Sequence, residues 1–474
     1  MSTDTLDPPK TINKQASTSQ TTPTDRCPAI SYQEVLDTDS RPVPEELRIV
    51  TVADLPDEPI DSERYTSAEF HKLEMQQMWS RVWQMACREE EIPNVGDYSL
   101  YEIGDSSLLI TRTDANTIKA FHNSCLHRGR TLRDVDGHAK EFICPFHGFT
   151  WNLDGTFKQA PCEWDFPQCT ESDFSLPEAH VARWGGFVFI NLADEPQPFD
   201  DYAAVLKQHF KRWPLDHCWK AVHVQKIVAA NWKATMEAFI ESFHAMETHP
   251  QILPYSGDAN SQYDVFDENV SRTITMMGIQ SPHIPDVSAQ EMMDALIETS
   301  GRMAEDSDQD TSVPSNKSAR LHMADINRAE FGQLFNMDLS HASDTEVLDA
   351  ILYNLFPNFV PWAGLNPNIV YRFRPNGNDP DSSIMDVMVL MRYAEGDPKP
   401  DPVPIHKLGV DDPWTNAEEL GALGGIFDQD MGNLPYVQKG LKASRKGMIT
   451  LGNYQEVRIK HFHTTLNRYI KNKE

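Results

Sequence analysis

CLHRG at residues 125–129 and CPFHG at residues 144–148 are the two stretches that decide how the first half of this chain folds. Together they supply four ligands for a metal group: Cys125, His127, Cys144 and His147. Such ligands can bind zinc, or a [2Fe–2S] cluster in which two histidines hold one iron. Each cysteine is followed by a histidine two or three residues later. Many zinc sites instead have a pair of cysteines in one stretch and a pair of histidines in another. The glycines also allow tight loops with free backbone N–H groups for bridging sulfides. The pattern favours the cluster, with zinc as the alternative.

Short apolar runs separated by Gly, Asp and Asn surround these two stretches. They occupy residues 98–103, 107–112, 117–123, 141–144 and 186–191. Short runs with this punctuation are typical of strands. We therefore predict a small all-β domain over about residues 90–200.

The chain before this domain divides into two parts. Residues 1–50 are rich in Thr, Ser, Pro and Asp and poor in large apolar side chains, so they are expected to form a disordered tail. Between residues 67 and 85, apolar residues recur on one helical face. Residues 51–89 are therefore expected to form a helical segment that packs on the second domain.

Residues 201–474 have the pattern of a second, mixed domain. Spacing predicts helices over 202–213, 232–246 and 456–470, and strands over 222–229, 368–374 and 384–392. An acidic stretch rich in Ser and Met, about 281–344, resembles an insertion. Its helical pieces, near 289–303 and 328–337, are expected to decorate the surface, and the alternative is that they cover a pocket.

Composition limits the class of protein. The 71 acidic residues outnumber the 42 basic ones, and the formal net charge is −29. This balance argues against binding to nucleic acid and against docking on anionic membranes. No run approaches the roughly 18 apolar residues of a membrane-spanning helix, and residues 1–10 lack the apolar run of a secretory signal. Seven cysteines, an odd number spread unevenly, do not suggest a disulfide framework, so a cytoplasmic protein is expected.

A second group of polar residues lies within residues 231–250. Glu237, Glu241 and His244 fall on one face of an ideal helix. His244 and His249 are five residues apart and would point away from each other on such a helix. Both can bind one metal only if the helix loosens between them. A surface helix with scattered acids and histidines is the other interpretation.

Both groups, in this order and at about this separation, resemble the alpha subunits of bacterial Rieske non-haem iron aromatic ring-hydroxylating oxygenases. Further matching features are FTW at 149–151, Gly155, and NWK at 231–233. The similarity covers roughly residues 60–470. It implies an α+β fold with an all-β Rieske [2Fe–2S] domain. The catalytic domain would be an antiparallel sheet flanked by helices, of the helix-grip, START-like kind.

The resemblance also implies the roles of the candidate residues. The cluster ligands are Cys125, His127, Cys144 and His147. His244 and His249 would bind mononuclear Fe(II), with Asp430 from GIFDQD at 425–430 as the third ligand and Asp428 as the fallback.

Glu241 is the position where the sequence departs from the family. Its counterpart in most members is Asp, which bridges subunits. By resemblance, Glu241 would link His147 of one copy to His244 of its neighbour. Glu at this position also resembles the branch of the family that acts on quaternary ammonium compounds.

The implied function is that of a terminal oxygenase. It would take electrons from a ferredoxin, a flavin-dependent NAD(P)H reductase or both, and use O₂ to hydroxylate or dihydroxylate an organic substrate, with an aromatic one expected first. A homotrimer is implied, with or without a β subunit. The alternatives are a betaine- or carnitine-type quaternary-ammonium monooxygenase or demethylase, and a Rieske electron-transfer protein without oxygenase activity.

Overall fold

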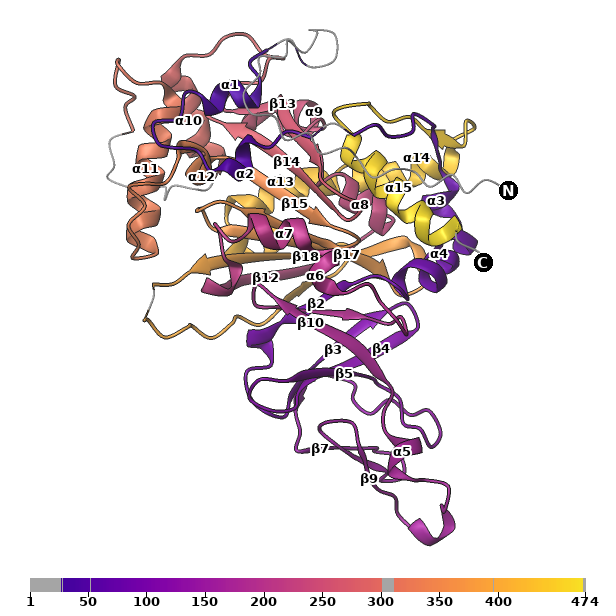
Figure 1. Ribbon diagram of the computed structural model, residues 1–474. Helices are drawn as coiled ribbons and strands as arrows, with labels where there is room; N and C mark the ends of the chain where they lie inside the picture. Colours follow the sequence, from indigo (N-terminus) through magenta and orange to yellow (C-terminus); the bar gives the residue numbers. More distant parts are fainter. Residues whose placement is uncertain (1–26, 28, 52, 301–310, 395, 472–474) are drawn as a thin grey trace.

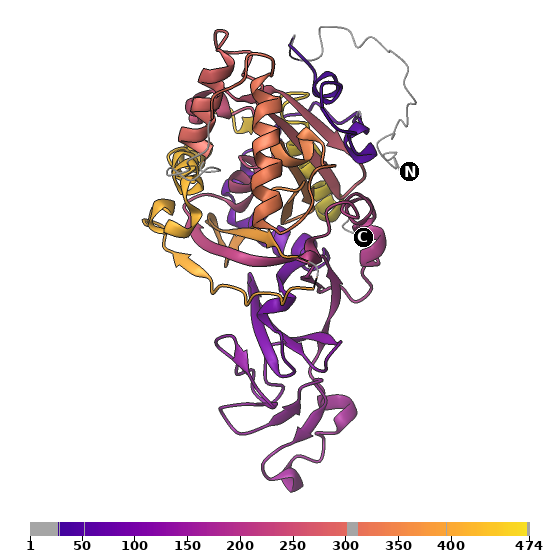
Figure 2. The ribbon, with the colours of Figure 1, turned by 90° about the vertical axis from the view of Figure 1, so that its left-hand side faces the viewer.

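The computed structural model describes residues 27, 29–51, 53–300, 311–394 and 396–471. Two parts are stacked along the long axis of the molecule (Figure 1). The upper part is a large sheet surrounded by helices. The lower part is a narrower all-β projection that carries the two cysteine–histidine stretches, and Figure 2 shows it extending from the upper part.

Two sheets form the lower part. The larger follows the order β2-β11-β10-β5-β4-β3-β6 and the smaller the order β7-β8-β9. The five predicted apolar runs coincide with β3, β4, β5, β7 and β11 to within one residue at either end. The strands are β2 Gln84–Arg88, β3 Asp97–Ile103, β4 Ser106–Arg112, β5 Ile118–His122, β6 Gly137–His138, β7 Glu141–Ile143, β8 Thr150–Asn152, β9 Phe157–Gln159, β10 Glu178–Trp184 and β11 Phe187–Asn191. The short helices are η2 Glu89–Glu91, η3 Glu163–Asp165 and α5 Glu171–Phe174.

The helix predicted over residues 67–85 is shorter than expected. It begins as α4 Ala68–Glu74, continues as the π-helix η1 Met75–Trp79, and then the chain enters β2. All five residues of β2 are buried, and Cys87 pairs with Val188 of β11. Sheet pairing therefore overrides helical spacing at the end of this segment.

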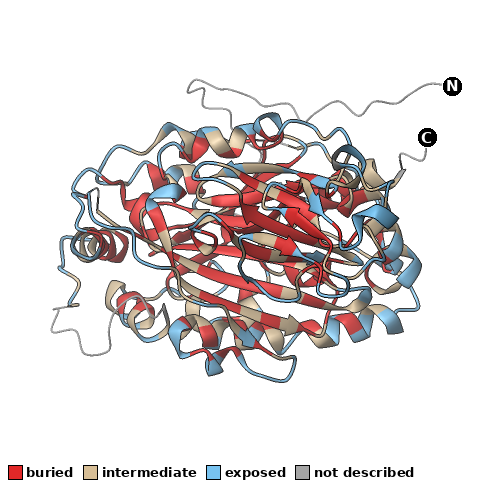
Figure 3. Cartoon of the chain, turned by 90° about the horizontal axis from the view of Figure 1, so that it is seen from below, coloured by how far each residue is buried: buried red, intermediate tan, exposed pale blue. Residues whose placement is uncertain are grey.

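An eight-stranded sheet lies at the centre of the upper part, in the order β13-β14-β15-β16-β17-β18-β12-β19. Its pairs are antiparallel except for β12 with β19. Seen from below, its strands are mostly buried (Figure 3). The strands are β12 Cys218–Val228, β13 Ser256–Val265, β14 Val270–Met277, β15 Ala350–Leu355, β16 Phe359–Ala363, β17 Asn368–Asn376, β18 Asp379–Arg392 and β19 His406–Leu408. A separate two-stranded pair joins β1 Ile60–Asp61 to β20 Met448–Ile449.

Helices surround this sheet. They are α3 Glu63–Thr66, α6 Phe199–Tyr202, α7 Ala204–His209, η4 Leu215–His217, α8 Trp232–Glu237, α9 Ala245–Thr248, η5 Pro250–Ile252, η6 Trp414–Asn416, η7 Glu418–Leu420, α13 Ala422–Met431, α14 Leu434–Ala443 and α15 Val457–Lys471. The prediction over 456–470 is confirmed by α15, whereas 202–213 is divided between α6 and α7. Within the described ranges, none of the helices combines the length and apolar character needed to cross a membrane.

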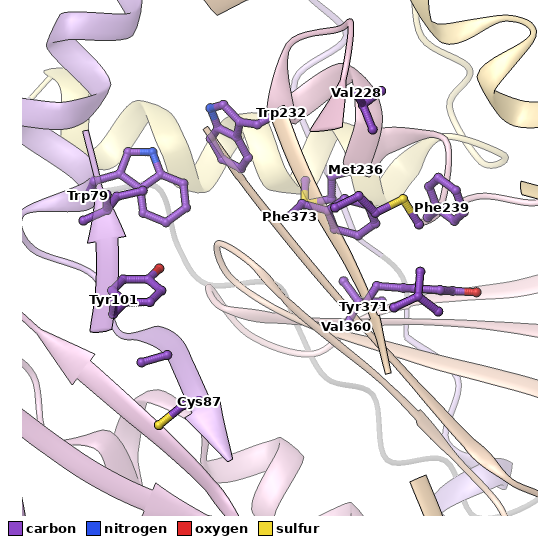
Figure 4. Packing of buried hydrophobic residues seen from close by; sticks show 14 of the residues in the cluster. Trp79, Cys87, Tyr101, Val228, Trp232, Met236, Phe239, Val360, Tyr371 and Phe373 are labelled. Atoms are coloured by element: carbon purple, nitrogen blue, oxygen red, sulfur yellow. The ribbon is translucent and has the colours of Figure 1, made fainter. Parts of the chain in front are cut away.

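One apolar core joins the two parts of the molecule. It runs from Tyr101 in the lower sheet to the residues around Trp232 at the start of α8 (Figure 4). Trp232 is fully buried, with its ring 5.0 Å from that of Trp79 and 5.6 Å from that of Phe462. The start of α8 is therefore held by the N-terminal and C-terminal helical segments together.

The predicted disordered tail is wrong for the residues after 30. Residues 1–26 and 28 lie outside the described residues, but α1 Tyr32–Leu36 and α2 Glu45–Arg48 are ordered helices. Tyr32, Val35 and Leu36 are buried in the core of the upper part. Helix α1 packs on β13 and β14 of the central sheet, which are distant in sequence, so local composition does not reveal this packing.

The acidic insertion contains α10 Ala289–Ser300 and α11 Ala319–Leu334, and α12 Asp344–Leu348 begins where it ends. These helices have an apolar core of their own. The Arg320 guanidinium joins them to the rest of the chain, with ion pairs to Asp349 at 2.7 Å and Asp39 at 3.2 Å.

Candidate metal centres and pocket

The two cysteine–histidine stretches form loops with the same hydrogen-bond pattern. Gly129 N–H donates to the Cys125 carbonyl at 2.8 Å, and Gly148 N–H donates to the Cys144 carbonyl at 2.9 Å. Both glycines have a positive φ, 74° and 78°, which favours glycine. Cys125 N–H and Cys144 N–H close the loops on the carbonyls five residues later. The loops therefore present their side chains in matching ways.

The four predicted cluster ligands lie together at the tip of the lower part. Both cysteines are buried. The rings of His127 and His147 lie 4.8 Å apart, and Phe149 stacks on His127 at 4.5 Å. The Nδ1 atom of His127 is buried and has no hydrogen-bond partner. An unpaired buried nitrogen beside a second histidine and two cysteines fits the ligand set of a Rieske cluster.

The helix predicted over residues 232–246 is broken. It ends as α8 at Glu237, and α9 begins only at Ala245. Side chains distant in sequence bind the backbone between these helices: Tyr263 accepts from Ser242 N–H at 3.0 Å, while Thr273 and Arg458 donate to the Ile240 carbonyl at 3.1 and 2.9 Å. These bonds replace helical ones.

The break brings His244 and His249 together with Asp430 of α13. One ligand atom of each residue lies within 4.8 Å of the others. Asp430 Oδ1 is 3.1 Å from His249 Nε2 and 3.5 Å from His244 Nε2. Two imidazoles and one carboxylate in this arrangement fit a facial triad for Fe(II) with open positions.

A hydrogen bond at the far nitrogen orients each histidine. His244 Nδ1 is 2.6 Å from Glu241 Oε1, and His249 Nδ1 is 2.8 Å from Gln429 Oε1. Because both acceptors are oxygens, each Nδ1 carries the hydrogen and each Nε2 is free to bind a metal. The sequence interpretation missed Gln429, although it adjoins Asp430.

Asp428, the fallback ligand, has another role. Its carboxylate accepts from Trp414 N–H at 2.6 Å and from the Thr415 hydroxyl at 2.9 Å, at the start of η6. It therefore holds a turn rather than facing the histidines.

Glu241 is bound on both of its oxygens. Oε1 accepts from the His244 ring, and Oε2 accepts from the backbone N–H groups of Phe243 and His244. Burial alone would lower the pKa of His244, but Glu241 and then Asp430 outweigh it, so its pKa lies above the ordinary value. The predicted bridge from Glu241 to His147 joins two copies of the chain and stays a prediction.

A pocket of about 200 Å³ opens beside the triad. Phe239, Ala245 and Leu423 line it, whereas Met236 belongs to the apolar core. The lining residues are Ala238, Phe239, Glu241, Ser242, His244, Ala245, His249, Ile252, Tyr255, Ser256, Thr275, Met277, Leu296, Ala350, Leu352, Trp362, Tyr371, Leu423, Ile426, Phe427 and Asp430.

The acidic insertion takes part in this pocket. Leu296 of α10 lines it, and the Tyr255 hydroxyl lies 2.8 Å from that of Thr299 on the same helix. The expectation that the insertion only decorates the surface is therefore wrong for α10, because its apolar face packs toward η5 and α13 rather than solvent.

A buried polar network lies behind α8. The Glu237 carboxylate is 2.8 Å from His463 Nε2 and accepts from the Tyr65 hydroxyl at 3.0 Å. Burial raises the pKa of Glu237 to about 8, against the opposing effects of Tyr65 and of the nearby Lys233 charge. Burial also holds the pKa of His463 well below its ordinary value. The pair is therefore a protonated acid beside a neutral imidazole.

Comparison with known families matches both parts of the chain. Residues 82–170 match the Rieske [2Fe–2S] domain, and residues 206–472 match the ring hydroxylating alpha subunit (catalytic domain). The predicted two-part α+β fold is confirmed by these matches and by solved structures. One of them is the quaternary ammonium Rieske monooxygenase CntA, with a TM-score of 0.60 and 16% identity over 87% of this chain and 95% of that one.

Curated relatives include enzymes with different substrates. The glycine betaine monooxygenase oxygenase subunit of Chromohalobacter salexigens is 34% identical over 196 residues, which are 40% of this chain and 42% of that protein. The chlorobenzene dioxygenase subunit alpha of a Cupriavidus species is 30% identical over 196 residues, 40% of this chain and 43% of that protein. The chain spans about two fifths of the length of the curated relatives it matches.

Proposed function

Because the chain belongs to the family of ring-hydroxylating alpha subunits, we propose that it is the terminal oxygenase component of a Rieske oxygenase system. The observation that carries this proposal is the triad of His244, His249 and Asp430 beside an aromatic-lined pocket. An electron-transfer protein would need neither. In a hydroxylation, one oxygen atom enters a C–H bond, and two electrons and two protons reduce the other atom to water. In a dihydroxylation of an arene, both oxygen atoms enter the product with the same two electrons and two protons.

The proposed electron route begins at Cys125, His127, Cys144 and His147, whose cluster accepts electrons from a ferredoxin, a flavin-dependent NAD(P)H reductase or both. It passes from His147 to Glu241 of a neighbouring copy in a homotrimer. Two exposed aromatic residues support this route: Phe146 beside His147 is 54% exposed, and Phe243 beside Glu241 is 48% exposed. When bound at the triad, Fe(II) supplies the site of O₂ activation. A cytoplasmic location is part of the proposal.

We place a quaternary ammonium compound first among the substrates, ahead of the arene expected from the sequence. The pocket has aromatic walls, whose ring faces attract organic cations, and no Lys or Arg among its described lining residues. Glu at position 241 and the similarity to a glycine betaine monooxygenase subunit give further support. Arenes remain the second candidate, since aromatic walls also bind them.

Metal content and oxygen uptake test the proposal. The purified protein should hold about three irons per chain with labile sulfide, and two irons would indicate an electron carrier. With a reductase and NADH, O₂ uptake should rise on adding a trimethylammonium compound and form a demethylated or hydroxylated product. Uptake coupled only to an arene would refute the ammonium assignment while leaving the oxygenase intact.

A further inference from the structure

The pocket is lined by acidic side chains that have no Lys or Arg beside them among the described lining residues. These side chains are Glu241 and Asp430. A bound divalent iron would neutralise these two carboxylates and leave no positive charge for an anionic group on a substrate. Burying a carboxylate without a counter-ion is strongly unfavourable.

Two hydroxyl groups of the pocket are occupied by internal hydrogen bonds. The hydroxyls of Ser242 and Thr275 lie 2.5 Å apart and are hydrogen-bonded to each other. Thr275 also lies 2.9 Å from the Ser261 hydroxyl. These groups are already partnered, so a substrate carboxylate would have to displace internal bonds.

Tyr371 lies at the centre of the aromatic wall. Its ring is 5.2 Å from Phe239, 6.1 Å from Phe427 and 6.4 Å from Trp362. Figure 4 shows Tyr371 of β17 near Phe239 of the segment between α8 and α9. Three chain segments that are distant in sequence thus surround one aromatic ring, and such faces attract organic cations.

The Tyr371 phenol remains uncharged. Burial, and next the negative charge of Asp430, hold its pKa well above the ordinary value. A neutral phenol supplies no positive charge to pair with a substrate carboxylate.

We infer that this pocket takes a trialkylammonium compound whose other end is uncharged, and that Tyr371 determines this specificity through its aromatic face. The inference rests on the proposed function and narrows it. The inference predicts that glycine betaine is a poor ligand, because its carboxylate would find no Lys or Arg among the described lining residues.

Anaerobic titration calorimetry on the iron-loaded holoenzyme tests the inference with three probes of similar shape. Choline carries the cation alone, glycine betaine adds a carboxylate, and 3,3-dimethylbutan-1-ol replaces the charged nitrogen of choline by carbon. Choline should bind about tenfold or more tightly than either of the others. Equal binding of choline and the neutral probe, or tighter binding of glycine betaine, would overturn the inference.

Variants of Tyr371 separate the aromatic face from the hydroxyl. Y371L should weaken choline binding about tenfold and change binding of the neutral probe much less, whereas Y371F should retain most of the preference for choline. Y436L, at a tyrosine that is 71% exposed on α14, is the matched control and should change neither. Iron content and the visible spectrum of the cluster report whether each variant is intact.

The same experiment distinguishes the two levels of proposal. If glycine betaine binds most tightly, the narrower inference fails and the ammonium oxygenase stands. If no ammonium probe binds while an arene drives O₂ uptake, both the inference and the ammonium assignment fail.

Discussion

Replacing Glu241 by Gln should weaken binding of the mononuclear iron without affecting the cluster. Glu241 Oε1 accepts from His244 Nδ1 at 2.6 Å, while Oε2 faces backbone N–H groups, including that of His244 at 3.1 Å. A carboxylate satisfies both sides, but an amide has only one oxygen. In E241Q, an NH₂ group must face either the backbone donors or the protonated ring nitrogen. One hydrogen bond to a charged group is lost, a contribution of about 1.5–3 kcal/mol.

That loss corresponds to a fall in iron affinity of about 10- to 100-fold, the range known for removal of a hydrogen-bond partner of a metal-binding histidine. Equilibrium dialysis against an Fe(II) chelator under argon measures it, with the cluster absorbance as the internal standard for protein. E247Q, at an exposed acid in the same segment, is the control and should bind iron normally. Unchanged iron affinity in E241Q would refute the orienting role of Glu241.

Three further predictions follow from the same geometry. D430N should lose the mononuclear iron and keep the two irons of the cluster, whereas D428N should keep all three in a colorimetric iron assay; iron retained by D430N would contradict its assignment. L36A should lower the free energy of unfolding by about 2–5 kcal/mol in denaturant titration, because Leu36 is 2% exposed, while I30A, at an exposed position, should change it little; equal effects would contradict the packing of α1. The pKa of Glu237 is about 8 in the folded chain and has its ordinary value of 4.5 in the unfolded chain. As the pH rises from 4.5 to about 8, the unfolded chain ionises first, so Glu237 lowers the free energy of unfolding over this range. E237Q should flatten the fall in melting temperature over that window, and an unchanged pH profile would argue against the buried neutral acid.

The cluster loops could be predicted because their determinants are local. Each loop needs only a cysteine, a histidine two or three residues later and a glycine with a positive φ, all within five residues. The strands around them also carry their own pattern.

The iron segment illustrates what local patterns miss. Sequence identified His244 and His249 and the need for a loosened helix, but not where the helix would end. That point is set by Tyr263, Thr273 and Arg458, whose side chains reach the segment from β13, β14 and α15. Tertiary hydrogen bonds override helical spacing there.

Local composition is also a poor guide to the N-terminal segment and the insertion. Low hydrophobicity suggested disorder for residues 31–50, yet a few apolar side chains suffice when a distant core receives them. Similarly, only the fold shows that Leu296 faces the pocket.

The contribution of α10 to the pocket has a consequence for how such a protein can change. The wall formed by α10 belongs to an insertion with its own apolar core, whereas the metal-binding side chains come from α13 and from the segment between α8 and η5. A substitution at Leu296, which lines the pocket, can therefore change the shape of the proposed substrate site without replacing any metal-binding side chain. Met293 on the same helix is fully buried, so a library for new selectivities should vary Leu296 and keep the residues that hold α10 against η5 and α13.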